Sequence, residues 1–369
     1  MAPTVGRNIA RDVRAPAGRA RDVSRPSETG RASWATAVHQ RAALTRRFVL
    51  LGVLLLVVVT VSLLIGRYPR PYLMSPALLR TDALAQRLVL FLRLPRVLVA
   101  LSTGMALAAA GAVLQLIFRN PLVDPGTLGV GQGAAFGAAF AIVYVSSSPV
   151  VVEVLATVFA FVGLGITYSL AVNMRYGDWV LRLVLAGIVS SALFSAGLGV
   201  LKYLADPLHE LPDIVFWLLG GLWASTWREV VWVLPAVVVG LVILVLMRWR
   251  VNLLALRDET AGSLGVAPTR ERAVVLIAAV TVTAVVASVA GQVGWIGLIV
   301  PHLARRIVGS DAQRLVPASI LLGGGTTVLC DNLARSLQAG EIPLSIVTSL
   351  FGAIAFVALF VGPHRRTLQ

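Results

Sequence analysis

Charged side chains are scarce in this sequence. Of its 369 residues only 13% are Asp, Glu, Lys or Arg, while 57% are hydrophobic. A soluble domain carries about 25% charged residues, so most side chains of this chain cannot face water. A helix crosses a bilayer core with roughly 20 apolar residues, and most of the chain divides into apolar segments of about that length. The composition therefore indicates a membrane protein.

The apolar segments also lack the alternation of polar and apolar residues that barrel strands require. Within a bilayer every backbone polar group must be paired internally, which leaves closed barrels and helices as the spanning structures. Continuous apolar segments therefore predict an all-α integral membrane protein.

Lysine and cysteine are each present once. Leu201 precedes the single lysine, Lys202, so the chain lacks the Gly-Lys-Ser/Thr of a nucleotide-binding loop and is not expected to hydrolyse ATP. It also lacks the His-Glu-x-x-His and Gly-x-Ser-x-Gly patterns, and His302 has no second ligand for a metal. No catalytic residue, metal site or cofactor is predicted, and Cys330 is expected to be a buried packing residue.

Ten membrane spans are predicted, with surface helices expected within Arg67–Arg96 and Pro207–Gly221. The predicted spans are Phe48–Gly66, Val97–Ile117, Leu128–Val145, Val150–Val172, Val180–Leu204, Glu229–Met247, Ala273–Ala290, Val293–Ile307, Leu315–Ala334 and Leu344–Val361.

The arginines set the orientation. Ten of them precede Phe48, which predicts a disordered basic cytoplasmic tail at 1–47, followed by a transmembrane domain at 48–369. Ten spans place both termini in the cytoplasm, together with the basic loop 248–272. The six arginines of Arg67–Arg96 then lie outside, against the charge rule. Either they have an external acidic partner or the span count is off by one.

Several segments carry a family resemblance in a fixed order: Leu92–Arg96 with Ala106–Gln115, Arg119–Gly126, Phe216–Gly221, Asn252–Leu256 with Asp258–Ala261 and Ser263–Val266, Gly294–Arg305, Asp331–Arg335 and Glu341–Pro343. They resemble the FecCD-type permease family, the membrane subunits of BtuC-like type II ABC importers for ferric siderophores, haem and cobalamin. The chain departs from that pattern at Ile354, where the family usually has proline, and at Gln132, where serine or asparagine is commoner.

The resemblance implies a permease subunit that moves a ferric siderophore into the cytoplasm by alternating access, with haem or cobalamin as the alternative cargo. The implied partners are a second permease subunit, identical or paralogous, two ABC ATPase subunits that use the ATP, an extracytoplasmic binding protein and membrane lipid. No nucleic acid is expected. The implied location is the bacterial cell membrane, which the chain crosses many times.

The resemblance also implies roles for three groups of residues. The ATPase-coupling segment is Asp258, Glu259, Thr260, Ala261, Ser263, Leu264 and Gly265; an ordinary loop is the alternative. The binding-protein docking residues are Arg93, Arg96 and Arg335; interfacial anchors are the alternative. The cytoplasmic gate is Asn120, Pro121 and Leu122; a proline-directed turn is the alternative.

An ion-coupled secondary transporter is the rival from another class. Such a protein usually has paired acids at the membrane midplane, and Glu153 and Asp331 are the candidates here. Asn332 and Arg335 lie near Asp331 on the same helix, so a structural bond is expected there in preference to a proton relay.

Overall fold

In the computed structural model the described residues are 28–66, 68, 73–338 and 340–361, of which 28–40, 360 and 361 are described as backbone only. Apart from an isolated bridge between Ile65 and Leu73, the regular structure of these residues is helical. The elements are α1 Glu28–Leu64, α2 Leu78–Thr81, α3 Ala83–Arg87, π-helix η1 Leu88–Arg93, α4 Leu94–Ile117, 3₁₀-helix η2 Pro125–Leu128, α5 Val130–Tyr144, α6 Pro149–Asn173, α7 Trp179–Leu204, α8 Glu210–Leu219, α9 Trp227–Leu254, α10 Asp258–Ser263, α11 Pro268–Ala290, α12 Ile296–Val308, α13 Ala312–Ser336 and α14 Leu344–Val361.

Within the described residues each of the ten predicted spans coincides with one helix, namely α1, α4, α5, α6, α7, α9, α11, α12, α13 and α14. Six stretches are long and apolar enough to cross a membrane, and α5 and α14 are shorter apolar helices. The predicted surface helices are present as α2 and α3 in one segment and α8 in the other. The all-α membrane fold is therefore confirmed.

The first helix begins earlier than the sequence predicted. α1 starts at Glu28, so the backbone of 28–47, assigned from sequence to a disordered tail, is helical. Five of these twenty residues are alanine and four are arginine, and both residue types favour helix. Residues 1–27 lie outside the described residues. The chain divides within α1 into two units, Met1–Thr45 and Arg46–Gln369, and the helical bundle belongs to the second.

α4 forms the centre of the bundle, where it packs against α13, α9, α11 and α12. Most of its residues are buried. A Cβ atom on Gly104 would lie 2.1 Å from the carbonyl oxygen of Gly323, and one on Gly111 would lie 1.9 Å from that of Gly297. Only glycine lets the α4 backbone approach α13 and α12 this closely.

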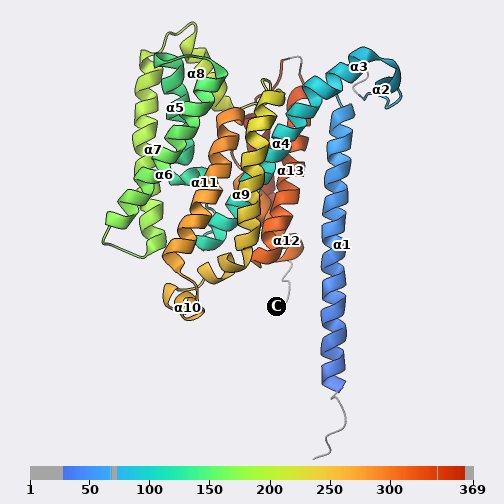
Figure 1. The fold of residues 1–369 in the computed structure, drawn as a ribbon, viewed down its shortest axis with the longest axis vertical. Coiled ribbons are helices and arrows are strands. Elements are labelled where there is room, and N and C mark those ends of the chain that lie inside the picture. The colour runs from blue at the N-terminus through green and yellow to red at the C-terminus, as the bar shows by residue number, and fades with distance from the viewer. Residues whose placement is uncertain (1–27, 67, 69–72, 339, 362–369) are drawn as a thin grey trace, which may run out of the picture. The chain divides into compact units, whose positions relative to one another are not determined.

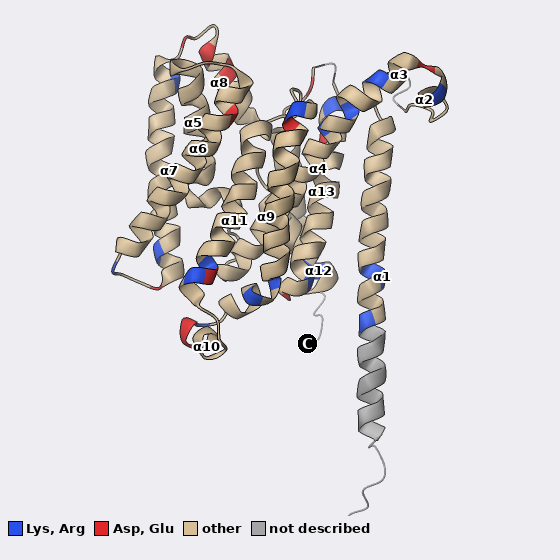
Figure 2. Ribbon diagram, viewed as in Figure 1, with Lys and Arg blue, Asp and Glu red and all other residues tan. Residues whose placement is uncertain are grey.

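Charge is confined to the two ends of the bundle (Figure 2). One end carries α10, and the opposite end carries α3 and α8 (Figure 1). The band between them is almost free of charged side chains, as the hydrocarbon layer of a bilayer requires.

Candidate functional site

The coupling segment predicted from sequence forms a short helix at one end of the bundle. α10 follows α9 after three residues and packs against α9 and α11. Arg272 of α11 is 3% exposed and donates two hydrogen bonds to the Asp258 carboxylate, at 2.7 and 3.0 Å, and one to the Leu254 carbonyl at 3.2 Å. These bonds hold the pKa of Asp258 below its usual range. α10 is therefore held on the bundle by a buried cation.

The outer surface of α10 is open. Glu259, Thr260 and Ser263 are exposed, and Leu264 is 56% exposed, whereas Ala261 is fully buried. Gly265 has a left-handed backbone, with φ +79°, which ends the helix and returns the chain to the bundle. The coupling role of this exposed face stays a prediction.

The predicted gate residues form a tight turn that begins where α4 ends. The Asn120 side-chain oxygen accepts a hydrogen bond from the Leu122 amide at 2.9 Å, which closes an Asx turn over Pro121. All three residues are exposed, and Leu122 is 54% exposed. The structure thus places an apolar side chain at the surface of a polar turn.

The buried side-chain amide of Gln115 connects the end of the turn to α12. Gln115 is 2% exposed, and its amide nitrogen lies 3.2 Å from the Val123 carbonyl and 3.1 Å from the Leu298 carbonyl of α12. Arg305 donates to its side-chain oxygen at 2.7 Å. Both residues lie in motifs noted from sequence, but the sequence analysis gave neither a role.

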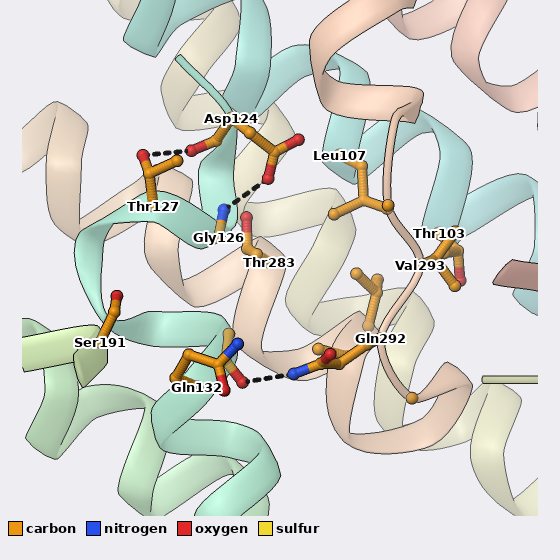
Figure 3. A pocket seen from close by; sticks show the side chains of 15 residues that line it. Thr103, Leu107, Asp124, Gly126, Thr127, Gln132, Ser191, Thr283, Gln292 and Val293 are labelled. Atoms are coloured by element: carbon orange, nitrogen blue, oxygen red, sulfur yellow. Dashed lines mark hydrogen bonds between the residues drawn. The ribbon is translucent and has the colours of Figure 1, made fainter. Parts of the chain in front are cut away.

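A cavity of about 350 Å³, whose surface is mainly apolar but includes several polar side chains, lies between α4, α5, α7 and α11 and is lined in part by the segment that follows the turn (Figure 3). One oxygen of Asp124 accepts a hydrogen bond from the Gly126 amide at 2.8 Å, and Gln292 donates to the Gly131 carbonyl at 3.1 Å. Thr103 lines the same cavity, and its buried hydroxyl has no partner among the described residues. Gln132, noted above as a departure from the family pattern, also lines it.

The three predicted docking arginines lie at the opposite end of the bundle, but they are occupied within the chain. Arg93 is 7% exposed and donates to the carbonyls of Leu63, Leu64 and Tyr68 at 3.0, 3.2 and 2.7 Å. Arg335 is 9% exposed and donates to the Ser62 carbonyl at 2.6 Å and to the Asn332 side chain. These two arginines fix α1 against α4 and α13. Their docking role stays a prediction. Because both side chains are buried, little of their surface is available to a binding protein.

Arg96 makes the strongest ion pairs of this cluster. It donates to both oxygens of Asp331, with the shortest contact at 2.9 Å, and to Glu341 at 2.7 Å. The Asp331 side chain is 1% exposed, whereas that of Glu341 is 37% exposed. Asp331 therefore forms a structural bond, as expected, but its close partner is Arg96 of α4, whereas Arg335 on its own helix lies 3.8 Å away. The second candidate acid of a secondary transporter, Glu153, pairs with Arg228 at 3.2 Å. The two acids lie in separate ion pairs and do not form a joint site.

A larger cavity, of about 780 Å³, opens at this same end beside α8. Its lining includes the aromatic residues Phe216, Trp217 and Trp223 and the acids Glu153, Asp213 and Glu341. Among the described residues that line it there is no Lys, Arg or His.

These features define a polytopic helical membrane protein, with the short helix α10 and the turn Asn120–Leu122 at one end and an open cavity at the other. The chain belongs to the FecCD transport family, whose sequence model matches residues 54–362. It is therefore an ABC importer permease and a multi-pass protein of the bacterial cell membrane.

Individual relatives support the same assignment. The chain is 39% identical to the molybdate import system permease protein MolB of Haemophilus influenzae, over 84% of this chain and 94% of the relative. It is 39% identical to an iron chelatin transport system permease protein of Helicobacter pylori, over 74% of this chain and 82% of the relative. A solved structure described as an inward-facing conformation of a metal-chelate type ABC transporter matches with a TM-score of 0.80 at 37% identity, covering 86% of this chain and 100% of that one.

Proposed function

We propose that this chain is the permease subunit of an ATP-driven importer for an iron chelate, a ferric siderophore in particular. It works with a second permease subunit, two ATPase subunits and an extracytoplasmic binding protein. The ATP is used by the ATPase chains, and this chain binds no cofactor. The cargo enters at the α8 end and leaves past the turn Asn120–Leu122 by alternating access.

The observation that carries the cargo assignment is the lining of the 780 Å³ cavity. Named relatives transport cargoes as different as molybdate, haem and iron chelates. A small oxyanion is bound by arginines, lysines or backbone amides, whereas the described lining of this cavity has three aromatic rings and no lysine or arginine. Two of its three carboxylates, Glu153 and Glu341, are paired with Arg228 and Arg96, and the third, Asp213, forms no ion pair with the described residues. The cavity volume lies within the range of roughly 300–1,000 Å³ that holds drug-sized ligands. A bulky chelate that is neutral or positively charged fits this lining better than an oxyanion.

Transport by the complete complex in proteoliposomes tests this proposal. With ATP inside the vesicles, we expect uptake of a neutral ferric hydroxamate complex and little uptake of molybdate. The matched control is the same complex with an ATPase subunit unable to hydrolyse ATP. Uptake of molybdate in preference to every iron chelate, haem and cobalamin would overturn the cargo assignment. Uptake that needs an ion gradient and no ATP would favour a secondary transporter.

A further inference from the structure

The side chain of Arg119 joins the gate turn to the coupling segment. Its guanidinium donates a hydrogen bond to the carbonyl of Leu256, 137 positions further along the chain. Leu256 lies in the short connection between α9 and α10, and Arg119 directly precedes the gate residue Asn120. One arginine therefore contacts both of the segments on which the proposed transport cycle depends.

The backbone at Arg119 has the geometry of a glycine position. The Arg119 amide donates to the Leu116 carbonyl at 3.2 Å, and the Asn120 amide donates to the Gln115 carbonyl at 3.2 Å. This pair of bonds is the Schellman motif that ends many helices, and it requires a left-handed residue in the place that Arg119 occupies, with φ +50°. Glycine is strongly preferred there because side chains are strained in that conformation.

The same motif at the end of α10 shows the ordinary solution. There the Gly265 amide donates to the Gly262 carbonyl at 3.0 Å, and the Val266 amide donates to the Ala261 carbonyl at 3.1 Å. The left-handed position in this second motif is a glycine, with φ +79°. At the end of α4 the chain instead holds an arginine, so its side chain has a use that outweighs the strain.

Folding stability does not account for that use. Arg119 is exposed, and polar contacts of exposed cations add little to stability. Its positive charge does act on the coupling helix, since it helps to hold the pKa of Asp258 low, after the stronger effect of Arg272. The Arg119 guanidinium thus interacts with the segment just before α10 and with the first residue of α10 itself.

We propose that Arg119 is a positioning residue that transmits movement of α10 to the gate turn. This inference rests on the proposed function. The two arginines at α10 differ in what they connect. Arg272 fixes Asp258 to α11, a long helix of the bundle, while Arg119 connects Leu256 to a turn of three exposed residues. A displacement of α10 by the ATPase pulls on the Arg119 side chain and shifts Asn120–Leu122.

Replacement by glycine gives a sharp test, because Arg119→Gly removes the side chain and supplies the residue that the backbone favours. The complete complex is compared with the variants Arg119→Gly, Arg119→Lys and Arg175→Ala in proteoliposomes. Arg175 is an exposed arginine in the connection between α6 and α7 and serves as the control. The readout is the amount of iron chelate transported per ATP hydrolysed. A charged hydrogen bond justifies an expected loss of about tenfold in Arg119→Gly, with partial rescue by lysine and no change in Arg175→Ala.

A second readout does not depend on the cargo. In a Cys330→Ala background carrying Leu122→Cys, ATP is expected to change crosslinking between two permease subunits, and Arg119→Gly is expected to abolish that change. Both an unchanged ratio of transport to ATP hydrolysis and an unchanged crosslinking response would overturn the role of Arg119. Loss of ATPase binding in Arg119→Gly would also overturn it, since the residue would then serve assembly. Failure of the proposed function would appear in the wild-type complex, as absence of ATP-driven uptake.

Discussion

The ion pair of Arg96 with Asp331 is the clearest structural role of a single residue in this bundle. Asp331 is almost fully buried, and its next cation, Arg335, lies 3.8 Å away. A buried carboxylate that loses its partner costs about 3–5 kcal/mol. We therefore expect Arg96→Ala to lower the stability of the purified protein by about that amount, measured as a fall in the thermal unfolding temperature in detergent.

The second substitution Asp331→Asn, added to Arg96→Ala, removes the uncompensated charge and is expected to restore part of the loss. The control is Arg80→Ala, at an exposed arginine of α2. Equal unfolding temperatures for Arg96→Ala and Arg80→Ala would show that the buried pair contributes nothing measurable.

If Arg96 takes part in docking, its positive charge is divided between Glu341 of the same chain and the acidic binding protein. Glu341 is the exposed partner of Arg96, so Glu341→Gln leaves the cluster more positive toward the outside. If Arg96 takes part in docking, the affinity for the binding protein rises in Glu341→Gln. The affinity is also expected to decrease as the salt concentration increases, because the screening length shrinks from about 10 Å at 0.1 M to about 3 Å at 1 M. The measurement is a titration of the binding protein at several salt concentrations.

Asp206→Asn is the control for this titration, since it makes the same charge change elsewhere at this end of the bundle. Should Glu341→Gln bind no more tightly than Asp206→Asn, and should salt have no effect, the arginines serve only to join α1, α4 and α13.

At the scale of an element, α10 has an outward face that its own chain does not use. Leu264 is exposed, and Glu259 carries no hydrogen bond or ion pair with the described residues. The double substitution Glu259→Arg and Leu264→Glu is therefore expected to leave the bundle intact and to disrupt only the proposed docking of an ATPase subunit. We expect the variant to insert in the membrane, to lose the ATPase subunit on purification and to transport nothing.

Leu208→Glu is the matched control, because Leu208 is 79% exposed and lies at the opposite end of the bundle. This variant is expected to retain the ATPase. Retention of the ATPase by the double variant, with normal uptake, would exclude α10 as the coupling helix.

Helix positions were predictable because their signals are local. Pro149 and Pro268 begin α6 and α11 at the first helical position, and Thr226 with Glu229 forms a capping box on α9. The helical start of α1 was missed because a basic, alanine-rich segment reads equally as a tail or as a helix.

At the scale of the whole transporter, the turn Asn120–Leu122 is expected to meet its counterpart in a second permease subunit. Cysteine at Asn120 or Leu122, in a Cys330→Ala background, is expected to crosslink the two subunits when the gate is closed. The Cα atoms then come within disulfide range, roughly 4.4–6.8 Å. The yield, measured by gel electrophoresis, is expected to change when ATP binds or is hydrolysed.

Cysteine at Tyr203, an 88% exposed residue near the end of α7, is the control and is expected to give a yield that ATP does not change. In a heterodimer the matching residue of the second permease also carries a cysteine. No crosslink at either gate position in any nucleotide state would leave the turn as a structural corner.

The sequence by itself determined the helical class, the positions of the ten predicted spans and the turn at Pro121, since apolar length and proline act over a few positions. Only the tertiary structure decided which side chains meet. Arg96 reaches Asp331 and Arg119 reaches Leu256 because α4 lies in the centre of the bundle, close to α13 and α9. Such contacts join residues more than a hundred positions apart, and helix packing alone selects them. The same packing determined that Arg93 and Arg335 are buried, which no local pattern around an arginine can indicate.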